Sequence, residues 1–225
     1  MEEGWMKLTQ PVLLQSFTDE FELPTQKAMT PAVPGDVLQK SGDEPGMDAE
    51  SQTKYRSGVG KLLHMMRWSR PEILNAVREL SRFGGIADPA HMKALMRTMK
   101  YCSATPNRGL LLKPDCKWDG NKDFQFTINA RSDSEFMKDA MTRKSVGGHV
   151  VYLNGAPVCL ASKMQRIVAL SVTEAELIQC VECAQDMLYV MHVLEDLGLK
   201  VSKPMILECD NQGAVNIANN WSSMG

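Results

Sequence analysis

Residues 146–161 read VGGHVVYLNGAPVCLA, and this stretch decides the fold class of the chain. Val146 to Leu153 is rich in β-branched and aromatic residues, which favour strands. Asn154-Gly155 is typical of a two-residue turn between antiparallel strands, so Ala156 to Ala161 is the expected partner strand. The stretch therefore predicts a β-hairpin around which the rest of this region has to be arranged.

Further strands and helices surround this hairpin. Phe124 to Ser132 alternates apolar and polar side chains, which predicts a strand before it. Ser171 to Leu197 predicts a long helix after it, and a strand at Pro204 to Cys209 and a helix at Asp210 to Asn220 follow. The order strand, hairpin, long helix, strand, helix is typical of an α/β layer with a mixed sheet.

The long helix has a predicted start, end and core face. Ser171 and Glu174 have the spacing of a capping box, and Gly198 is a typical residue after a helix end. Apolar side chains at helical spacing predict the face that packs on the sheet. That predicted face comprises Leu177, Val181, Ala184, Leu188 and Met191.

The first half of the chain has a different composition. Five of the eleven prolines lie in the first 50 residues, so residues 1–54 are expected to be linker-rich and partly disordered, with one short helix at 9–17. Residues 55–118 contain three stretches of helical periodicity and predict a helical segment. Residues 119–225 form the predicted α/β domain.

Charge is distributed unevenly between these regions. Residues 55–118 hold 12 Lys and Arg against 4 Asp and Glu, whereas residues 119–225 hold 9 against 13. A basic segment beside an acidic one fits a phosphate-binding surface next to a carboxylate-built metal site. Ordinary unevenness of surface charge is the alternative interpretation.

Cysteine usage and hydropathy indicate the compartment. The six cysteines form no dense framework, which favours a reduced, intracellular setting. Cys180 and Cys183 form a CxxC inside the predicted long helix, where buried helix cysteines are a better interpretation than zinc ligands. The chain contains no apolar run of 18 residues, so no membrane association is expected.

Three acidic residues occupy positions where strands and helices meet. Asp133 follows the first strand, Asp210 ends the last strand, and Glu176 lies near the start of the long helix. If these strands are neighbours, the three carboxylates converge, and a divalent cation would offset their repulsion. The alternative is structural, because Asp often caps a helix and Glu near a helix start favours the dipole.

Several ordered motifs resemble copia-type retrotransposon polyproteins. RSDSEFMKDAMTRKS at 131–145 resembles SDADWAGD…RKS, LSVTEAEL at 170–177 resembles LSSTEAEY, and LECDNQGAV at 207–215 resembles CDNQSA. NGAPV followed by SKMQ resembles the family's hairpin between these motifs. Residues 54–83 resemble the segment that joins reverse transcriptase to ribonuclease H. The resemblance covers residues 54–225 well and residues 1–53 loosely.

The resemblance implies a fold and an activity. The fold is a ribonuclease H-like mixed sheet of antiparallel hairpin strands plus one parallel strand, with flanking helices, preceded by a small helical segment. The activity is Mg²⁺-dependent hydrolysis of the RNA strand of RNA–DNA hybrids. By motif position, Asp133, Glu176 and Asp210 carry over as catalytic ligands of two Mg²⁺ ions, or Mn²⁺ in their place. Glu176 is preferred to Glu174, since related enzymes place the ligand in the AEL part.

The resemblance also leaves the activity open. The family's fourth acidic residue lies in a His-Ile-Asp motif after the last helix, and these 225 residues do not contain that motif. The domain is therefore expected to be C-terminally incomplete. One alternative is an inactive relic that only binds nucleic acid. Another is a connector that holds the reverse transcriptase portion of the same polyprotein, in the cytoplasm or a virus-like particle.

Polar and basic residues provide a predicted hybrid-binding surface. Basic helices are expected to follow phosphates, and polar groups near the carboxylates to contact 2′-hydroxyls in the minor groove. Solvated surface positions are the alternative for each of them. The predicted phosphate contacts are Arg67, Arg70, Arg78, Arg97 and Lys100, and the predicted polar contacts are Asn154, Gln179, Asn211 and Gln212.

Overall fold

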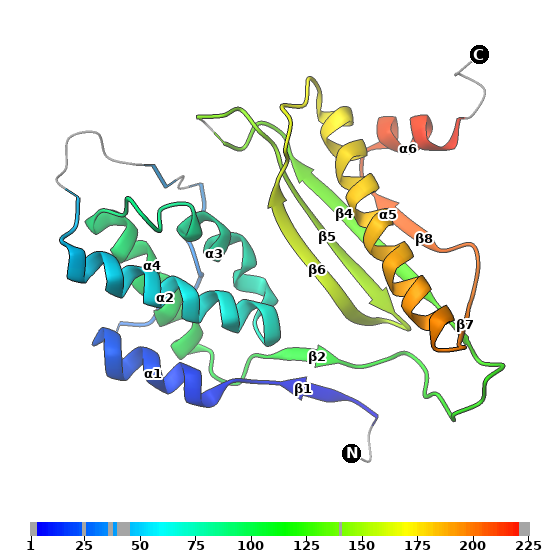
Figure 1. Cartoon of the computed structure of the whole chain (residues 1–225), viewed down its shortest axis with the longest axis horizontal. Helices are drawn as coiled ribbons and strands as arrows, with labels where there is room; N and C mark the ends of the chain where they lie inside the picture. The colour runs from blue at the N-terminus through cyan, green and yellow to red at the C-terminus, as the bar shows by residue number, and fades with distance from the viewer. Residues whose placement is uncertain (1–3, 24–25, 36–37, 40–45, 140, 221–225) are drawn as a thin grey trace. The chain divides into compact units, whose positions relative to one another are not determined.

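The structure is a computed structural model that describes residues 4–23, 26–35, 38–39, 46–139 and 141–220. The chain divides into two compact units, one of residues 7–110 and one of residues 1–6 with 111–225 (Figure 1). Within the described residues, no helix combines the length and the apolar character that crossing a membrane requires.

The first unit is a small helical bundle. Buried aromatic and apolar side chains such as Phe17, Tyr55 and Leu95 form one continuous core that joins its helices. Asp48 caps α2 by accepting a hydrogen bond from the Ser51 backbone N at 2.7 Å. The helices are α1 (Pro11–Phe21), α2 (Ala49–Trp68), the 3₁₀ turn η1 (Pro71–Ile73), α3 (Leu74–Ser81) and α4 (Pro89–Ala104).

The boundaries of this unit differ from the expected ones. The expected border between residues 54 and 55 falls inside α2, because the cap at Asp48 starts that helix earlier. The short helix expected at 9–17 continues to Phe21, whose ring is buried in the same core. The unit ends at Leu110, before the expected border at 118. Part of the predicted linker, including 40–45, lies outside the described residues.

The second unit is built on a four-stranded sheet with the order β6-β5-β4-β8. Neighbours β4 and β5, and β5 and β6, run antiparallel, whereas β4 and β8 run parallel. This is the predicted α/β architecture, a ribonuclease H-like mixed sheet. Its strands are β4 (Ile128–Glu135), β5 (Val146–Leu153), β6 (Ala156–Met164) and β8 (Ile206–Cys209).

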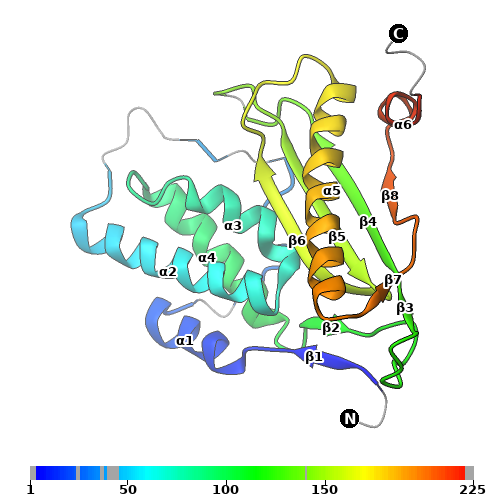
Figure 2. The same cartoon turned by 45° about the vertical axis from the view of Figure 1, so that its right-hand side comes forward.

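Short strands and two helices complete the elements. Strand β1 pairs with β2, and β3 pairs in parallel with β7. The long helix α5 packs along the sheet against β4 and β5, which Figures 1 and 2 show from two directions. These elements are β1 (Met6–Leu8), β2 (Leu110–Leu112), β3 (Gln125–Phe126), β7 (Lys200–Val201), α5 (Val172–Asp196) and α6 (Gln212–Asn219).

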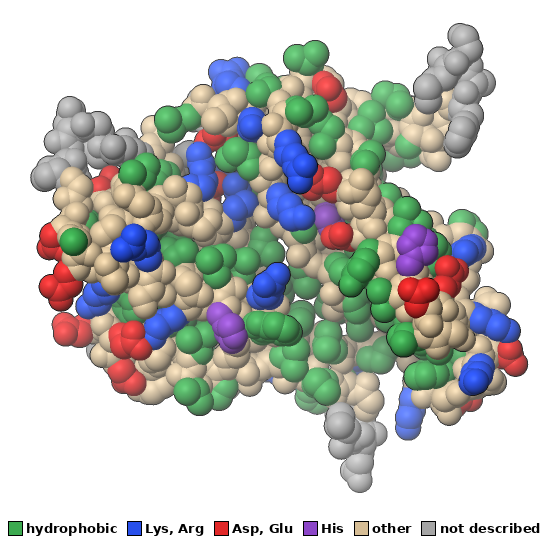
Figure 3. All heavy atoms as spheres, in the orientation of Figure 1, with side chains coloured by type: hydrophobic (Ala, Val, Ile, Leu, Met, Phe, Trp, Pro, Cys, Tyr) green, Lys and Arg blue, Asp and Glu red, His purple; other side chains and the backbone are tan. Residues whose placement is uncertain are grey.

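The face of α5 that packs on the sheet is not the predicted one. Val181 and Leu188 are 58% and 43% exposed, and of the predicted set only Met191 is buried. The buried face instead carries Glu176, Gln179, Cys183, Met187, Met191 and Leu194. Apolar residues occur on more than one side of this helix, so periodicity alone selects the wrong one. In Figure 3, hydrophobic side chains lie among charged ones on the visible surface.

Candidate functional site

The parallel pairing of β4 with β8 aligns two aspartates. Ser132 of β4 and Cys209 of β8 are register partners. Asp133 follows Ser132 in the chain, and Asp210 follows Cys209. Both strands run in the same direction, so both aspartates lie toward the same edge of the sheet. Both are exposed. The adjacency of the two strands, on which the predicted convergence depends, is therefore present.

Glu176 approaches this edge from α5. Ser171 caps the helix by accepting a hydrogen bond from the Glu174 backbone N at 3.1 Å, so Glu176 falls in the first turns of α5. Its side chain is buried, and its Oε1 accepts hydrogen bonds from the backbone N and hydroxyl of Ser134 at 3.0 and 2.8 Å. Among the ion pairs of the described residues, none reaches Glu176.

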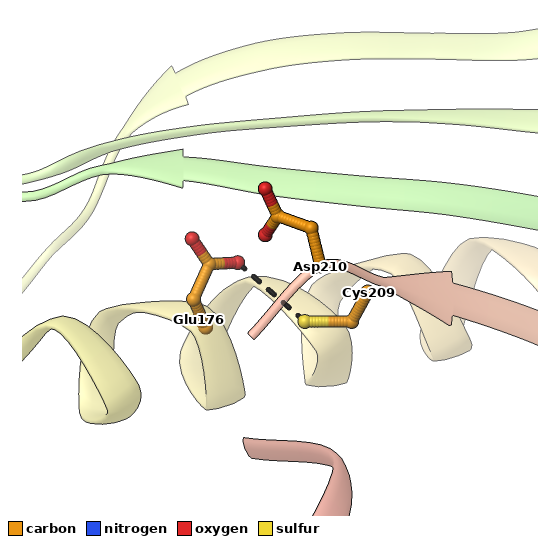
Figure 4. Close-up of side chains that lie close together, drawn as sticks. All are labelled: Glu176, Cys209 and Asp210. Atoms are coloured by element: carbon orange, nitrogen blue, oxygen red, sulfur yellow. Dashed lines mark hydrogen bonds between the residues drawn. The ribbon is translucent and has the colours of Figure 1, made fainter. Parts of the chain in front are cut away.

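Glu176, Cys209 and Asp210 form a compact group of potential ligands. One ligand atom from each lies within 4.8 Å of the others, and Figure 4 shows the three side chains converging from α5 and the end of β8. The Cys209 thiol donates to Glu176 Oε2 at 3.7 Å. Asp133 is outside this group, although its strand position is level with Asp210. The structure thus brings Glu176 and Asp210 together. Ser132 and Ser134 both contact α5, so the side chain of Asp133 between them alternates to the other face of β4 and does not join the group.

The Cys209 thiol has an altered acidity. Burial raises its pKa to about 11, and the Cys180 thiol and the Glu176 carboxylate contribute in the same direction, against a backbone hydrogen bond from Asn211. Near neutral pH this group therefore keeps its proton. Sulfur is a poor ligand for Mg²⁺, whereas the carboxylate oxygens of Glu176 and Asp210 have the donor chemistry that suits this ion.

The polar residues predicted to contact the minor groove have other roles. Asn154 is buried at the hairpin turn, where its side chain accepts a hydrogen bond from the Thr127 backbone N at 2.8 Å. Thr127 precedes β4, so Asn154 is at the opposite end of that strand from Asp133, and its predicted place near the site is wrong. Gln179 lies on the buried face of α5 and is likewise not a surface contact.

The two predicted residues on α6 are close to Asp210 in sequence. Asn211 caps α6, and its side chain accepts a hydrogen bond from the Ala214 backbone N at 2.9 Å. Gln212 is exposed and donates to Asn216 within the same helix. Asn211 therefore has a structural role, and Gln212 is the predicted polar contact that is still exposed beside the site.

The predicted phosphate contact at Arg70 is wrong. This side chain is 2% exposed, and it donates to the backbone oxygens of Cys102 and Thr105 and to Glu72. A guanidinium so enclosed holds the end of α4 in place and does not reach a ligand.

The other four predicted cations differ in exposure. Arg67 is exposed, and Lys100 is half-buried. Arg78 is half-buried against Glu79, and Arg97 is half-buried and donates to Thr30. Arg67 is therefore the one of the five that combines full exposure with a place on a basic helix.

Sequence reasoning missed a buried polar chain beneath α5. Gln179 Nε2 lies 2.7 Å from His149 Nδ1, and His149 Nε2 lies 2.7 Å from Asp186 Oδ2. A Cβ at Gly147 would stand 1.6 Å from Gln179 Oε1, so only glycine leaves room for this amide. The glycine pair inside a predicted strand was the available signal, because such glycines often mark a close approach.

Comparison with known proteins identifies relatives of this chain. It is 33% identical over 175 residues to the retrovirus-related Pol polyprotein from transposon RE1 of Arabidopsis thaliana. These aligned residues make up 78% of this chain and 11% of that relative. It is 31% identical over 170 residues to the corresponding polyprotein from transposon TNT 1-94 of Nicotiana tabacum, covering 76% and 12%. The chain belongs to the copia-type, retrovirus-related Pol polyproteins.

This copia-type Pol segment spans about a tenth of the length of these two relatives. It is also 32% identical over 136 residues to the secreted RxLR effector protein 161 of Plasmopara viticola, covering 60% of this chain and 90% of that protein. No family model and no solved structure matches the segment.

Proposed function

We propose that this copia-type Pol segment is a ribonuclease H, which hydrolyses the RNA strand of RNA–DNA hybrids with Mg²⁺. The observation that carries the proposal is the buried carboxylate of Glu176, which lies within 4.8 Å of Asp210 and has no basic partner among the described ion pairs. A buried charge without a counter-charge is costly, and a bound cation removes that cost.

The donor set fits a hard cation. Glu176 and Asp210 supply carboxylate oxygens that lie close together. In this proposal Asp133, at the end of the neighbouring strand, would turn its carboxylate toward them when the ions bind. Mg²⁺ prefers such oxygens and keeps several waters, and Mn²⁺ accepts similar ligands. When bound, two such ions about 3.5–4 Å apart would activate a water molecule and stabilise the leaving oxygen of a phosphodiester.

The residues of the chain have separate tasks in this proposal. Ser134 holds Glu176 Oε1 with two hydrogen bonds, which leaves Oε2 on the side of Cys209 and Asp210. The β4–β8 register fixes Asp133 and Asp210 at one edge of the sheet, where both are exposed to an incoming strand. Because the carboxylates are held by rigid elements, little reorganisation is required when the substrate binds.

The experiment uses the 225-residue chain with a hybrid whose RNA strand is labelled. We expect Mg²⁺-dependent cleavage that Asp133→Asn, Glu176→Gln and Asp210→Asn each abolish. Asp196→Asn, at the far end of α5, is the matched control and should retain activity. The melting temperature measured against Mg²⁺ concentration is an independent readout, because an ion that binds only the folded state raises the stability of the protein. Full activity in Asp210→Asn would refute the site.

The non-catalytic alternatives are other outcomes of the same experiment. Hybrid binding without Mg²⁺-dependent cleavage would indicate a relic that only binds nucleic acid. Affinity for a separate reverse transcriptase fragment, with none for the hybrid, would indicate a connector. The burial of Arg70 removes one of the five cations on which hybrid binding by the helical unit would depend.

A further inference from the structure

A thiol lies among the carboxylates of the candidate site. Cys209 Sγ is 3.7 Å from Glu176 Oε2, and ligand atoms of Glu176, Cys209 and Asp210 all lie within 4.8 Å of one another (Figure 4). The proposed Mg²⁺ chemistry uses the two carboxylates and leaves this sulfur without a role. The mixed sulfur and oxygen donor set is itself a chemical signal, because it matches a different class of metal ion.

The separation of Cys209 Sγ from Glu176 Oε2 is close to that of two ligands on one tetrahedral ion. Zinc lies about 2.3 Å from a cysteine sulfur and about 2.1 Å from a carboxylate oxygen, which places two such ligands about 3.6 Å apart. The observed separation of Cys209 Sγ and Glu176 Oε2 is 3.7 Å. Little movement is therefore needed for both atoms to contact one ion.

The charge of the surroundings points to a cation as well. Glu176 is 2% exposed, and among the described residues its carboxylate accepts hydrogen bonds from the neutral groups of Ser134 and Cys209. Neutral donors satisfy hydrogen bonding, but they do not compensate the negative charge of a buried carboxylate. Asp210 adds a second negative charge at the exposed mouth of the group.

We propose that Glu176, Cys209 and Asp210 form a binding site for a thiophilic divalent cation such as Zn²⁺. The thiol would release its proton to solvent when the metal binds, because a coordinating thiol is deprotonated. The bound ion would occupy the carboxylates that Mg²⁺ requires and so inhibit cleavage. The inhibition rests on the proposed nuclease function, whereas the binding does not.

Cd²⁺ is the probe, because its bond to a thiolate gives a charge-transfer absorbance in the ultraviolet. Titration of the 225-residue chain should produce this band, and Cys209→Ser should lose the high-affinity part of it. The control is Cys116→Ser, which changes an exposed cysteine and should leave that part intact. Loss of an outer-shell partner alone costs a metal site about 10- to 100-fold in affinity, so we expect loss of this ligand to cost on the order of 100-fold.

Asp210→Asn gives a second test that keeps the sulfur in place. This substitution at an exposed residue should retain the band while weakening Cd²⁺ binding. Absence of the band in the natural chain, or equal affinity in the natural, Cys209→Ser and Asp210→Asn chains, would overturn the proposal. A chain that shows the band but cleaves no hybrid supports the cation site and contradicts the nuclease assignment. The two proposals can therefore fail separately.

Discussion

Ser134 donates two hydrogen bonds to one oxygen of Glu176, from its backbone N at 3.0 Å and from its hydroxyl at 2.8 Å. The contact joins β4 to α5 across 42 positions of sequence. It fixes the orientation of a buried carboxylate whose other oxygen faces Cys209 and Asp210. Ser134 is thus a positioning residue for the candidate site.

Ser134→Ala should weaken both the fold and the site. The backbone hydrogen bond remains, but the loss of a hydrogen bond to a charged group costs about 1.5 kcal/mol or more. We expect this loss in urea denaturation, together with a smaller Mg²⁺-induced rise in melting temperature. Ser162→Ala, on β6, is the control and should change neither quantity. An unaltered Mg²⁺ response in Ser134→Ala would rule out the positioning role.

Arg70→Ala should destabilise the helical unit strongly. The substitution removes the donor from the buried backbone oxygen of Cys102 and from the partly buried backbone oxygen of Thr105, at a cost of about 3 kcal/mol or more. The loss of helical circular dichroism in urea measures this effect. Arg67→Ala, at an exposed position near the end of α2, should stay within about 0.5 kcal/mol of the natural chain. Equal stability of the two variants would contradict the structural role of Arg70.

Gly147→Ala should displace the Gln179 amide, because the new Cβ would stand 1.6 Å from Gln179 Oε1. Overpacking of this kind costs about 1–3 kcal/mol. At the adjacent Gly148 a Cβ would have its nearest neighbour, the Ala161 backbone oxygen, at 3.4 Å, so Gly148→Ala should cost less. The double variant with Gln179→Ala should recover part of the loss in a double-mutant cycle. Strict additivity would show that the two residues do not interact.

The buried thiol of Cys102 predicts a loss of stability in alkali. Burial raises its pKa from 9.0 to about 12, while the Arg70 guanidinium lowers this pKa by less and the Glu72 carboxylate adds a further small rise. The folded chain therefore holds this proton more tightly than the unfolded chain. The resulting stabilisation is fully present below pH 9 and is lost between pH 9 and pH 12.

This alkaline dependence can be isolated by substitution. The free energy of unfolding should fall by about 1.6 kcal/mol between pH 9 and pH 10.5 through this group alone. Cys102→Ala removes the titrating thiol, so its stability should fall less steeply over the same range. Parallel pH profiles of the two chains would show that the Cys102 thiol does not contribute.

Local patterns in the sequence predicted the hairpin and the helix starts. The expected bounds of β5, Val146 and Leu153, are those observed, and Asn154 and Gly155 both adopt the positive φ of a two-residue turn. Ser171 caps α5 at the expected position. These features depend on residues within a few positions of one another, so the local sequence contains the information that determines them.

Features that depend on distant partners were not predictable in this way. Gln179 is buried because His149, 30 positions earlier, accepts its hydrogen bond. Arg70 is buried because its acceptors lie 32 and 35 positions later, at Cys102 and Thr105. A polar residue looks the same in the sequence whether its partner is water or a distant strand. The arrangement of Asp133 and Asp210 was expected only on the condition that β4 and β8 are neighbours.

The pairing of β4 with β8 also sets the order in which the molecule can assemble. Arg131 and Glu208 are register partners 77 positions apart, whereas β5 and β6 are joined by a two-residue turn. Hairpins close within microseconds, but a parallel pair has to wait for a long loop to close. The carboxylate pair should consequently be among the last features to form during folding. A proteolytic cut between β6 and α5 would turn this step into a bimolecular encounter.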